Sequence, residues 1–276
     1  MPEERRFFCT SDGAHLHFED QGQGRCLMLV PGFLCTTRFF CRNVEQLSKR
    51  YRVITIDPRG QGLSSKTLTG NTLQRHAMDI AELAEHLDLT NFVLLGWSLA
   101  ASTAISYAAE LDPGRLAGVI LVDGSLYPLS GEAWNRHRAR GGNIDHWLDT
   151  YLPLYEQPNQ FYDAFFRRMS AKGISDQDKV WMIHEFRKTP PWIALSIHGD
   201  FCHTDNVSRL PQVKVPIALF GGASVSYGLD MLYEYARHTA LPAQIYPFYE
   251  GGHLLFYYEA EKFNRAVAEF IDSLSR

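Results

Sequence analysis

The sequence predicts an α/β fold in which helices flank a mostly parallel sheet of eight strands. Three observations support this prediction. Short apolar runs, such as residues 92–95, have the composition of strands that are buried on both faces of a sheet. Segments with apolar residues at helical spacing lie between these runs, which is the pattern of βαβ units. The chain has 276 residues, of which 45% are hydrophobic and 21% charged, so it can bury the core of one large domain.

The expected strands and helices alternate along most of the chain. An Asp-Gly pair favours a hairpin between the first two strands, at residues 7–10 and 15–20. The other six strands are expected at residues 26–30, 53–56, 92–95, 116–122, 215–220 and 243–248. Helices are expected at residues 37–49, 73–87, 99–111, 229–239 and 259–274. Ligands of parallel sheets bind beyond the carboxyl ends of the strands, so residues at those ends are the first candidates for a site.

The alternation stops between residues 126 and 210. We expect three or four helices in this stretch, with interruptions at Pro153, Pro158 and the pair Pro190-Pro191. The stretch is rich in Trp, Tyr and Phe, which either pack its own interior or line an apolar pocket, and the two interpretations are compatible. We therefore expect residues 1–125 and 211–276 to form the core, and residues 126–210 to form a helical cap inserted after the sixth strand.

Ser98 stands in the sequence context of a nucleophile elbow. It follows a buried strand and precedes a helix that begins with small residues. The serine of such a turn has strained backbone angles, and its neighbours at minus two and plus two must be small. Gly96 and Ala100 meet this requirement. The alternative is an ordinary glycine-containing turn before a helix. The flanking strand and helix favour the nucleophile elbow over this alternative.

A serine nucleophile needs a base, an acid that orients the base, and hydrogen-bond donors for an oxyanion. His253 is the candidate base, because it follows the last strand in a turn that begins with Gly251-Gly252. Asp123 is the candidate acid because it ends the sixth strand; capping a helix or bracing a loop is its alternative role. We expect Asp230 to begin a helix instead.

Composition excludes several classes of partner and location. The formal net charge is −4 and there is no run of Lys or Arg, so we expect neither nucleic acid nor a membrane surface as a partner. No stretch reaches the roughly 18 apolar residues of a membrane span, and the first residues lack the apolar region of a signal peptide. We expect a cytoplasmic location with reduced thiols, because five cysteines form an odd set without C-x-x-C spacing: Cys9, Cys26, Cys35, Cys41 and Cys202. The oligomeric state is left open.

The expected cap contains two further histidines near acidic residues. His198 and His203 could be polar groups of a pocket, but surface positions are the simpler expectation. Together with Asp200 and Asp205 they match no metal site of known spacing, so neither a metal nor a cofactor is predicted.

The motifs at the strand ends resemble those of the α/β-hydrolase superfamily over nearly the whole chain. In family order and at family spacing these are Pro31-Gly32, the loop Asp57-x-Arg59-Gly60-x-Gly62-x-Ser64, Gly96-x-Ser98 and Gly251-Gly252-His253. The nearest resemblance is to bacterial esterases and non-haem haloperoxidase-like hydrolases, and the elbow is also similar to that of pimeloyl-carrier-protein methyl esterases. The resemblance implies an oxyanion hole formed by the backbone N–H groups of Phe33 and Leu99. It implies that Asp57 and Arg59 brace loops.

The chain departs from this family pattern in two places. The usual acid follows the seventh strand, where this chain has Ser224 and Ser226 and no carboxylate before Asp230. Asp123 takes an alternative position that is used elsewhere in the superfamily. Pro31 stands where many members have His, which resembles the cofactor-free dioxygenases that cleave 3-hydroxy-4-oxoquinolines. In those enzymes the histidine deprotonates the organic substrate and the serine only helps to bind it.

That dioxygenase group has a Trp where this chain has Phe33, a His where it has Cys35 or Thr37, and another His where it has Trp97. The dioxygenase is therefore the second of the two enzyme classes considered. A receptor or scaffold that has lost the chemistry is a further alternative, which the retained Ser, His and Asp disfavour. We therefore predict a serine hydrolase that cleaves an ester or related acyl bond of a small hydrophobic substrate, through Ser98, His253 and Asp123. The predicted substrate-binding residues are Trp97, Tyr127 and Trp192.

Overall fold

The computed structural model describes residues 6–142, 144–170, 173–222 and 227–274. These residues form an eight-stranded sheet in the order β1-β2-β4-β3-β5-β6-β7-β8. The first strands pair antiparallel, β1 with β2 and β2 with β4, and every other pair is parallel. The predicted mostly parallel sheet of eight strands is confirmed. The strands are β1 (Arg6–Cys9), β2 (His15–Gln21), β3 (Cys26–Val30), β4 (Arg52–Ile56), β5 (Phe92–Trp97), β6 (Leu116–Val122), β7 (Ile217–Gly222) and β8 (Gln244–Phe248).

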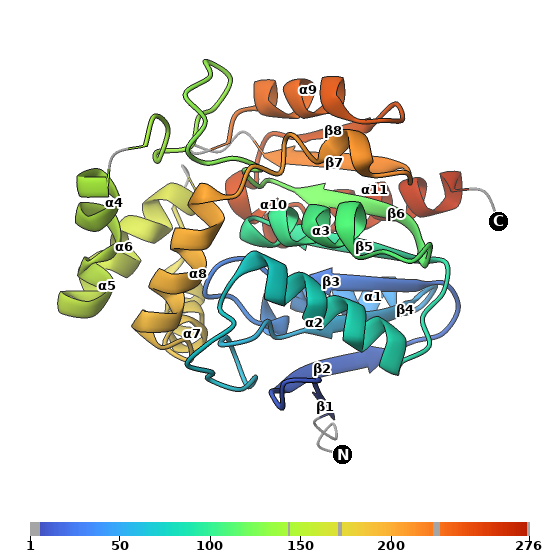
Figure 1. The fold of residues 1–276 in the computed structure, drawn as a ribbon, viewed down its shortest axis with the longest axis horizontal. Helices are drawn as coiled ribbons and strands as arrows, with labels where there is room; N and C mark the ends of the chain where they lie inside the picture. Colours follow the sequence, from blue (N-terminus) through green and yellow to red (C-terminus); the bar gives the residue numbers. More distant parts are fainter. Residues whose placement is uncertain (1–5, 143, 171–172, 223–226, 275–276) are drawn as a thin grey trace.

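Helices cover both faces of this sheet (Figure 1). On one face lie α2 (Leu73–His86), α3 (Leu99–Glu110) and α9 (Leu229–His238). On the other lie α1 (Cys41–Leu47), α10 (Leu255–Tyr258) and α11 (Ala260–Ser273). The helix expected at residues 37–49 is divided into a 3-10 turn, Thr37–Phe40, and α1. The division lets the consecutive rings of Phe39 and Phe40 both be buried, the first against Trp97 and the second against Phe256.

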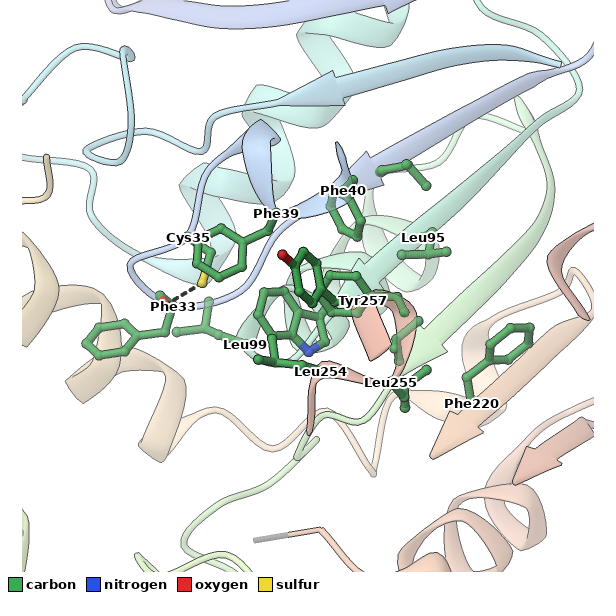
Figure 2. Packing of buried hydrophobic residues seen from close by; sticks show 14 of the residues in the cluster. Phe33, Cys35, Phe39, Phe40, Leu95, Leu99, Phe220, Leu254, Leu255 and Tyr257 are labelled. Atoms are coloured by element: carbon green, nitrogen blue, oxygen red, sulfur yellow. Dashed lines mark hydrogen bonds between the residues drawn. The ribbon is translucent and has the colours of Figure 1, made fainter. Parts of the chain in front are cut away.

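Strand side chains alternate between two hydrophobic clusters, one on each face of the sheet. Leu27 and Leu29 of β3 belong to the cluster on the α1 and α11 side, and Met28 and Val30 belong to the other. Figure 2 shows part of the first cluster, in which Phe39, Phe40, Leu95 and Phe220 gather with Leu254, next to His253, and with Leu255, the first residue of α10. The sheet, the first helix and the candidate base are therefore held by one continuous apolar core.

Between β6 and β7 the described residues contain five helices, where three or four were expected. They are α4 (Ile144–Tyr151), α5 (Pro153–Glu156), α6 (Pro158–Met169), α7 (Asp176–Phe186) and α8 (Pro191–His203). Pro153, Pro158 and Pro191 each stand at the first residue of a helix, where the missing proline N–H costs no intrahelical hydrogen bond. A new helix therefore begins at each of these prolines, and the segment has more helices than expected.

Figure 1 shows α4 to α8 gathered at the end of the sheet toward which the parallel strands point. Beyond this end of the sheet come Gly32 after β3, Ser98 after β5, Asp123 after β6 and His253 after β8. Within the described part of the chain, no helix is both long enough and apolar enough to cross a membrane.

Candidate active site

Ser98 occupies a sharp turn between β5 and α3. Its backbone angles are φ 59° and ψ −123°, a region that residues with a Cβ rarely adopt. A Cβ added to Gly96 would lie 2.2 Å from the carbonyl oxygen of Ala100, so strand and helix pass too closely for a side chain there. Ala100 itself is buried and its methyl group is accommodated. The turn has the geometry expected of a nucleophile elbow.

His253 links Ser98 to Asp123 through its two ring nitrogens. The hydroxyl of Ser98 lies 3.0 Å from Nε2 of His253, and Nδ1 of His253 lies 2.7 Å from Oδ2 of Asp123. A carboxylate accepts only, so Nδ1 carries the proton and Nε2 is left as the acceptor for the serine hydroxyl. All three residues are buried. The three residues predicted to act together are thus brought into one hydrogen-bonded chain.

Glycines at the strand ends allow this approach. The His253 turn, Gly252–Leu254, packs so tightly on β7 that a Cβ on Gly222 would lie 2.0 Å from the carbonyl oxygen of Gly252. The N–H of Gly222 donates to Oδ1 of Asp123 at 2.9 Å, which holds the second oxygen of the carboxylate. Asp123 directly follows β6 and has φ 41°, so its backbone also turns sharply at this point.

The loop after β3 runs against the side chain of Ser98. A Cβ on Gly32 would lie 2.7 Å from Cβ and 3.2 Å from Oγ of Ser98. The next residue, Phe33, and Leu99 both line the cavity at Ser98 (their side chains are labelled in Figure 2). Leu99 is the first residue of α3, so its backbone N–H has no acceptor within the helix. The role of Phe33 and Leu99 as backbone donors to an oxyanion stays a prediction from the resemblance.

Tyr227 completes the surroundings of Ser98 and was missed in the sequence. Its ring stacks on that of His253 with centroids 5.0 Å apart, and its hydroxyl shares a hydrogen bond with the Ser98 side chain. Burial raises the pKa of Tyr227, so the phenol keeps its proton at neutral pH. The residue lies five positions after the end of β7, and no sequence motif marks a tyrosine there. Ser224 and Ser226 lie outside the described residues.

The cavity beside Ser98 and His253 takes most of its other lining from the segment between β6 and β7. Rings and positive side chains share this lining, which comprises Phe33, Leu99, His137, Arg138, Tyr151, Phe165, Arg168, Met169, His198, Phe201 and Tyr227. The expected apolar pocket is therefore only partly apolar, because two guanidinium groups reach it.

None of the three predicted substrate-binding residues lines this cavity. Trp97 is fully buried against Phe39 and Phe256, and its Nε1 donates to the backbone oxygen of His253 at 3.0 Å. Tyr127 packs against the cluster on the α2 and α3 face. Trp192 stands in the first turn of α8 with 47% of its surface exposed. Aromatic content marked the correct segment, but the direction of each ring depends on packing that the sequence does not show.

The surface position expected for His198 is wrong, and that for His203 is correct. His198 is buried in the cavity lining, and its Nδ1 accepts a hydrogen bond from Nε1 of Trp147 at 3.0 Å. Burial holds the pKa of His198 well below its ordinary value, so the ring is neutral. The neighbouring acids face elsewhere: Asp200 accepts from the N–H of Leu73 at 2.7 Å, and Asp205 accepts from backbone groups of the next turn.

Asp57 and Arg59 brace loops, as the resemblance implied. The Asp57 carboxylate accepts from the N–H groups of Thr37 and Leu63, both at 2.8 Å. Arg59 donates to both oxygens of Asp79, at 2.7 and 2.9 Å. Asp230 lies in the first turn of α9 and pairs with Arg136 at the surface, at 2.6 Å. It therefore lies outside the hydrogen-bonded chain that Asp123 completes.

Comparisons of the sequence and of the fold find similar proteins. Residues 26–195 match the model of the family described as alpha/beta hydrolase fold. AB hydrolase superfamily protein YisY of Bacillus subtilis is 24% identical over 267 residues, covering 96% of this chain and 98% of that protein. A pimeloyl-acyl-carrier-protein methyl ester esterase of Chromobacterium violaceum is 27% identical over 261 residues, covering 94% and 99%. A solved structure of bromoperoxidase from Bacillus anthracis has a TM-score of 0.88 at 21% identity, covering 98% and 100% of the two chains.

Proposed function

The chain belongs to the alpha/beta hydrolase fold family and is an enzyme of hydrolase type, and from this premise we propose that it is a serine hydrolase of esters or related acyl compounds. The observation that carries the proposal is the pair of hydrogen bonds at His253. One joins it to Oγ of Ser98 at 3.0 Å and the other joins it to Asp123 at 2.7 Å. These distances are those that a nucleophile, a base and an orienting acid require.

In the proposed reaction, Oγ of Ser98 attacks the carbonyl carbon of the substrate while Nε2 of His253 takes the hydroxyl proton. Asp123 keeps the imidazole in the required tautomer and stabilises the imidazolium that forms. The oxyanion accepts hydrogen bonds from the backbone N–H groups of Phe33 and Leu99. His253 then gives its proton to the departing alcohol. Water hydrolyses the acyl-enzyme by the same route, with His253 as the base.

The rings in the cavity support a substrate with an apolar portion. Phe33, Tyr151, Phe165 and Phe201 line the space next to Ser98, and an acyl chain or aromatic group packed against them would lose contact with water. In this proposal residues 126–210 act as a cap that closes the site. A cytoplasmic location and the absence of nucleic-acid and membrane partners stay predictions from composition.

Labelling and paired substitutions test the assignment. A fluorophosphonate should add to Ser98 and abolish hydrolysis of 4-nitrophenyl esters, which intact mass and peptide mapping detect. Ser98→Ala and His253→Ala should each lose several orders of magnitude in kcat, because nucleophile and base act as a unit. Ser102→Ala is the control: this buried serine lies one turn further along α3 and donates to the backbone oxygen of Ser125 at 3.0 Å.

The same variants separate the hydrolase from the cofactor-free dioxygenase. If the reaction were oxygenation of a 3-hydroxy-4-oxoquinoline, His253→Ala would be severe and Ser98→Ala would keep part of the activity. Oxygen uptake with that substrate, together with no fluorophosphonate adduct on Ser98, would overturn the hydrolase proposal.

A further inference from the structure

Two arginine side chains reach the cavity that contains Ser98 and His253. Arg138 comes from the chain after β6, and Arg168 comes from the last turn of α6. The Arg138 guanidinium lies 4.5 Å from the ring centroid of Tyr151 and donates to its hydroxyl group. The Arg168 guanidinium lies 5.5 Å from the ring centroid of Phe165. Both cations therefore face the rings that line the site.

Neither arginine has a carboxylate partner among the described residues, and the cavity lining that they share contains no Asp or Glu. Nη2 of Arg168 is buried without any hydrogen-bond partner there. Arg59, a buried arginine elsewhere in the fold, forms ion pairs with Asp79 at 2.7 Å and with Asp12 at 2.9 Å. Arg138 and Arg168 have no such ion pair among the described residues.

An unpaired cation in this position is costly. Burial, and then the neighbouring charge of Arg138, lower the pKa of Arg168 to about 10. The guanidinium therefore stays protonated at neutral pH, although its surroundings disfavour the charged form. The two histidines beside it do not add charge, because burial lowers the pKa of His137 to about 3 and that of His198 well below its ordinary value. An anion bound in the cavity would offset both unfavourable effects on Arg168 through charge attraction and hydrogen bonds.

We propose that the substrate carries a carboxylate group, which Arg168 and Arg138 bind while its ester or related acyl group reaches Ser98. The inference rests on the proposed serine hydrolase function and adds the substrate class. The planar guanidinium fork suits a carboxylate, which it can bind through two parallel hydrogen bonds. The rings that share the cavity lining with the arginines and Ser98 fit an apolar spacer. A half-ester of a dicarboxylic acid, or an ester of a hydroxy- or phenol-carboxylic acid, has this arrangement.

A kinetic experiment with matched esters tests the proposal. Mono-4-nitrophenyl glutarate is compared with the 4-nitrophenyl ester of monomethyl glutarate, and 4-acetoxybenzoate is compared with its methyl ester. The wild type should favour the carboxylate member of at least one pair by tenfold or more in kcat/KM. Arg168→Gln should reduce that preference at least tenfold, mainly through KM. Arg167→Gln is the matched control, because Arg167 is the exposed neighbour on the same helix.

Direct binding gives a second readout that does not depend on turnover. Isothermal titration of the wild type with benzoate and glutarate should show binding that Arg168→Gln weakens at least tenfold and Arg167→Gln leaves unchanged. The uncharged analogue benzamide should bind more weakly than benzoate. Arg168→Gln and Arg168→Met should melt no lower than the unliganded wild type, because each removes an unpaired cation. Binding of inorganic phosphate but of neither carboxylate would overturn the proposal.

The outcomes separate this inference from the function on which it rests. Equal kcat/KM for the charged and neutral esters in the wild type and in Arg168→Gln, with Ser98 labelled, would overturn the carboxylate and leave the serine hydrolase standing. Failure of labelling and of all ester hydrolysis would overturn the serine hydrolase. The titration would then still decide whether the two arginines bind carboxylates.

Discussion

Asp123 and His253 are 130 residues apart in the chain, yet Oδ2 of the first lies 2.7 Å from Nδ1 of the second. The contact is made across the end of β7, whose last residue, Gly222, donates its N–H to the other carboxylate oxygen. The carboxylate that follows β6 therefore reaches His253 across the end of β7. The bare backbone of Gly222 leaves room for the His253 turn to pack there.

Asp123→Asn should leave the fold intact and lower kcat by about three to four orders of magnitude, since an amide can hold the wrong tautomer of the imidazole. Steady-state kinetics with a 4-nitrophenyl ester measures the effect, and circular dichroism verifies the fold. Asp230→Asn is the matched control, because its carboxylate pairs only with Arg136 among described residues and is exposed. Equal activity in the two variants would remove Asp123 from the mechanism.

Gly32→Ala should disable the proposed oxyanion hole. The new methyl group would come 2.7 Å from Cβ of Ser98, so the loop that carries the N–H of Phe33 must shift. Loss of one oxyanion donor lowers kcat by about a hundred- to a thousand-fold. Gly131→Ala is the control, because a Cβ there meets nothing within 4 Å. A Gly32→Ala enzyme with unchanged kcat would show that the loop does not contribute a donor.

Trp97→Phe should act through the position of His253 and not through substrate binding. The variant keeps a buried ring but loses the hydrogen bond from Nε1 to the backbone oxygen of His253. We expect the free energy of unfolding to fall by about 1 kcal/mol, and kcat to fall while KM stays constant. Trp192→Phe, at the exposed start of α8, should change neither. A raised KM in Trp97→Phe would restore the substrate-binding role predicted for it.

His76 predicts a pH dependence of stability. Burial lowers its pKa from the ordinary value of 6.5 to about 4, so between these values the unfolded chain binds more protons than the folded one. The stabilising effect of the neutral ring is complete above pH 6.5 and is lost as the pH falls toward 4, at up to about 1.4 kcal/mol per pH unit.

Urea unfolding at several pH values measures this slope. His76→Gln should show a shallower fall in the free energy of unfolding between pH 6.5 and pH 4.5 than the wild type. His86→Gln, exposed near the end of the same helix, should keep the wild-type slope. Identical slopes in all three proteins would mean that His76 takes up its proton without unfolding.

The sheet, the turn at Ser98 and the placement of His253 could be predicted because local sequence dictates them. Buried parallel strands are continuous apolar runs, as in β5, and a serine held at positive φ needs small neighbours, as at Gly96. The acid was reached by the same logic, since Asp123 is the carboxylate that ends a strand beside β5.

The lining of the cavity could not be predicted, because it depends on how short helices pack against one another. Arg167 and Arg168 are adjacent and chemically identical, yet one is exposed and the other reaches the cavity. The substrate-binding roles predicted for Trp97 and Trp192 were wrong for the same reason. The ring of Trp97 is buried in the core, and that of Trp192 is partly exposed to solvent. Helical spacing gives the relative directions of such side chains, while the absolute direction is fixed only by tertiary contacts.

The cavity is formed by two parts of the chain that are anchored differently. Ser98, Asp123 and His253 are fixed at strand ends, while the two arginines and most of the rings come from α4 to α8 and the chain before them. Substitutions between β6 and β7 can therefore alter the lining of the cavity while Ser98, Asp123 and His253 keep their geometry. A laboratory library that seeks new substrates should diversify that stretch and leave the strand ends, including the position of Trp97, untouched.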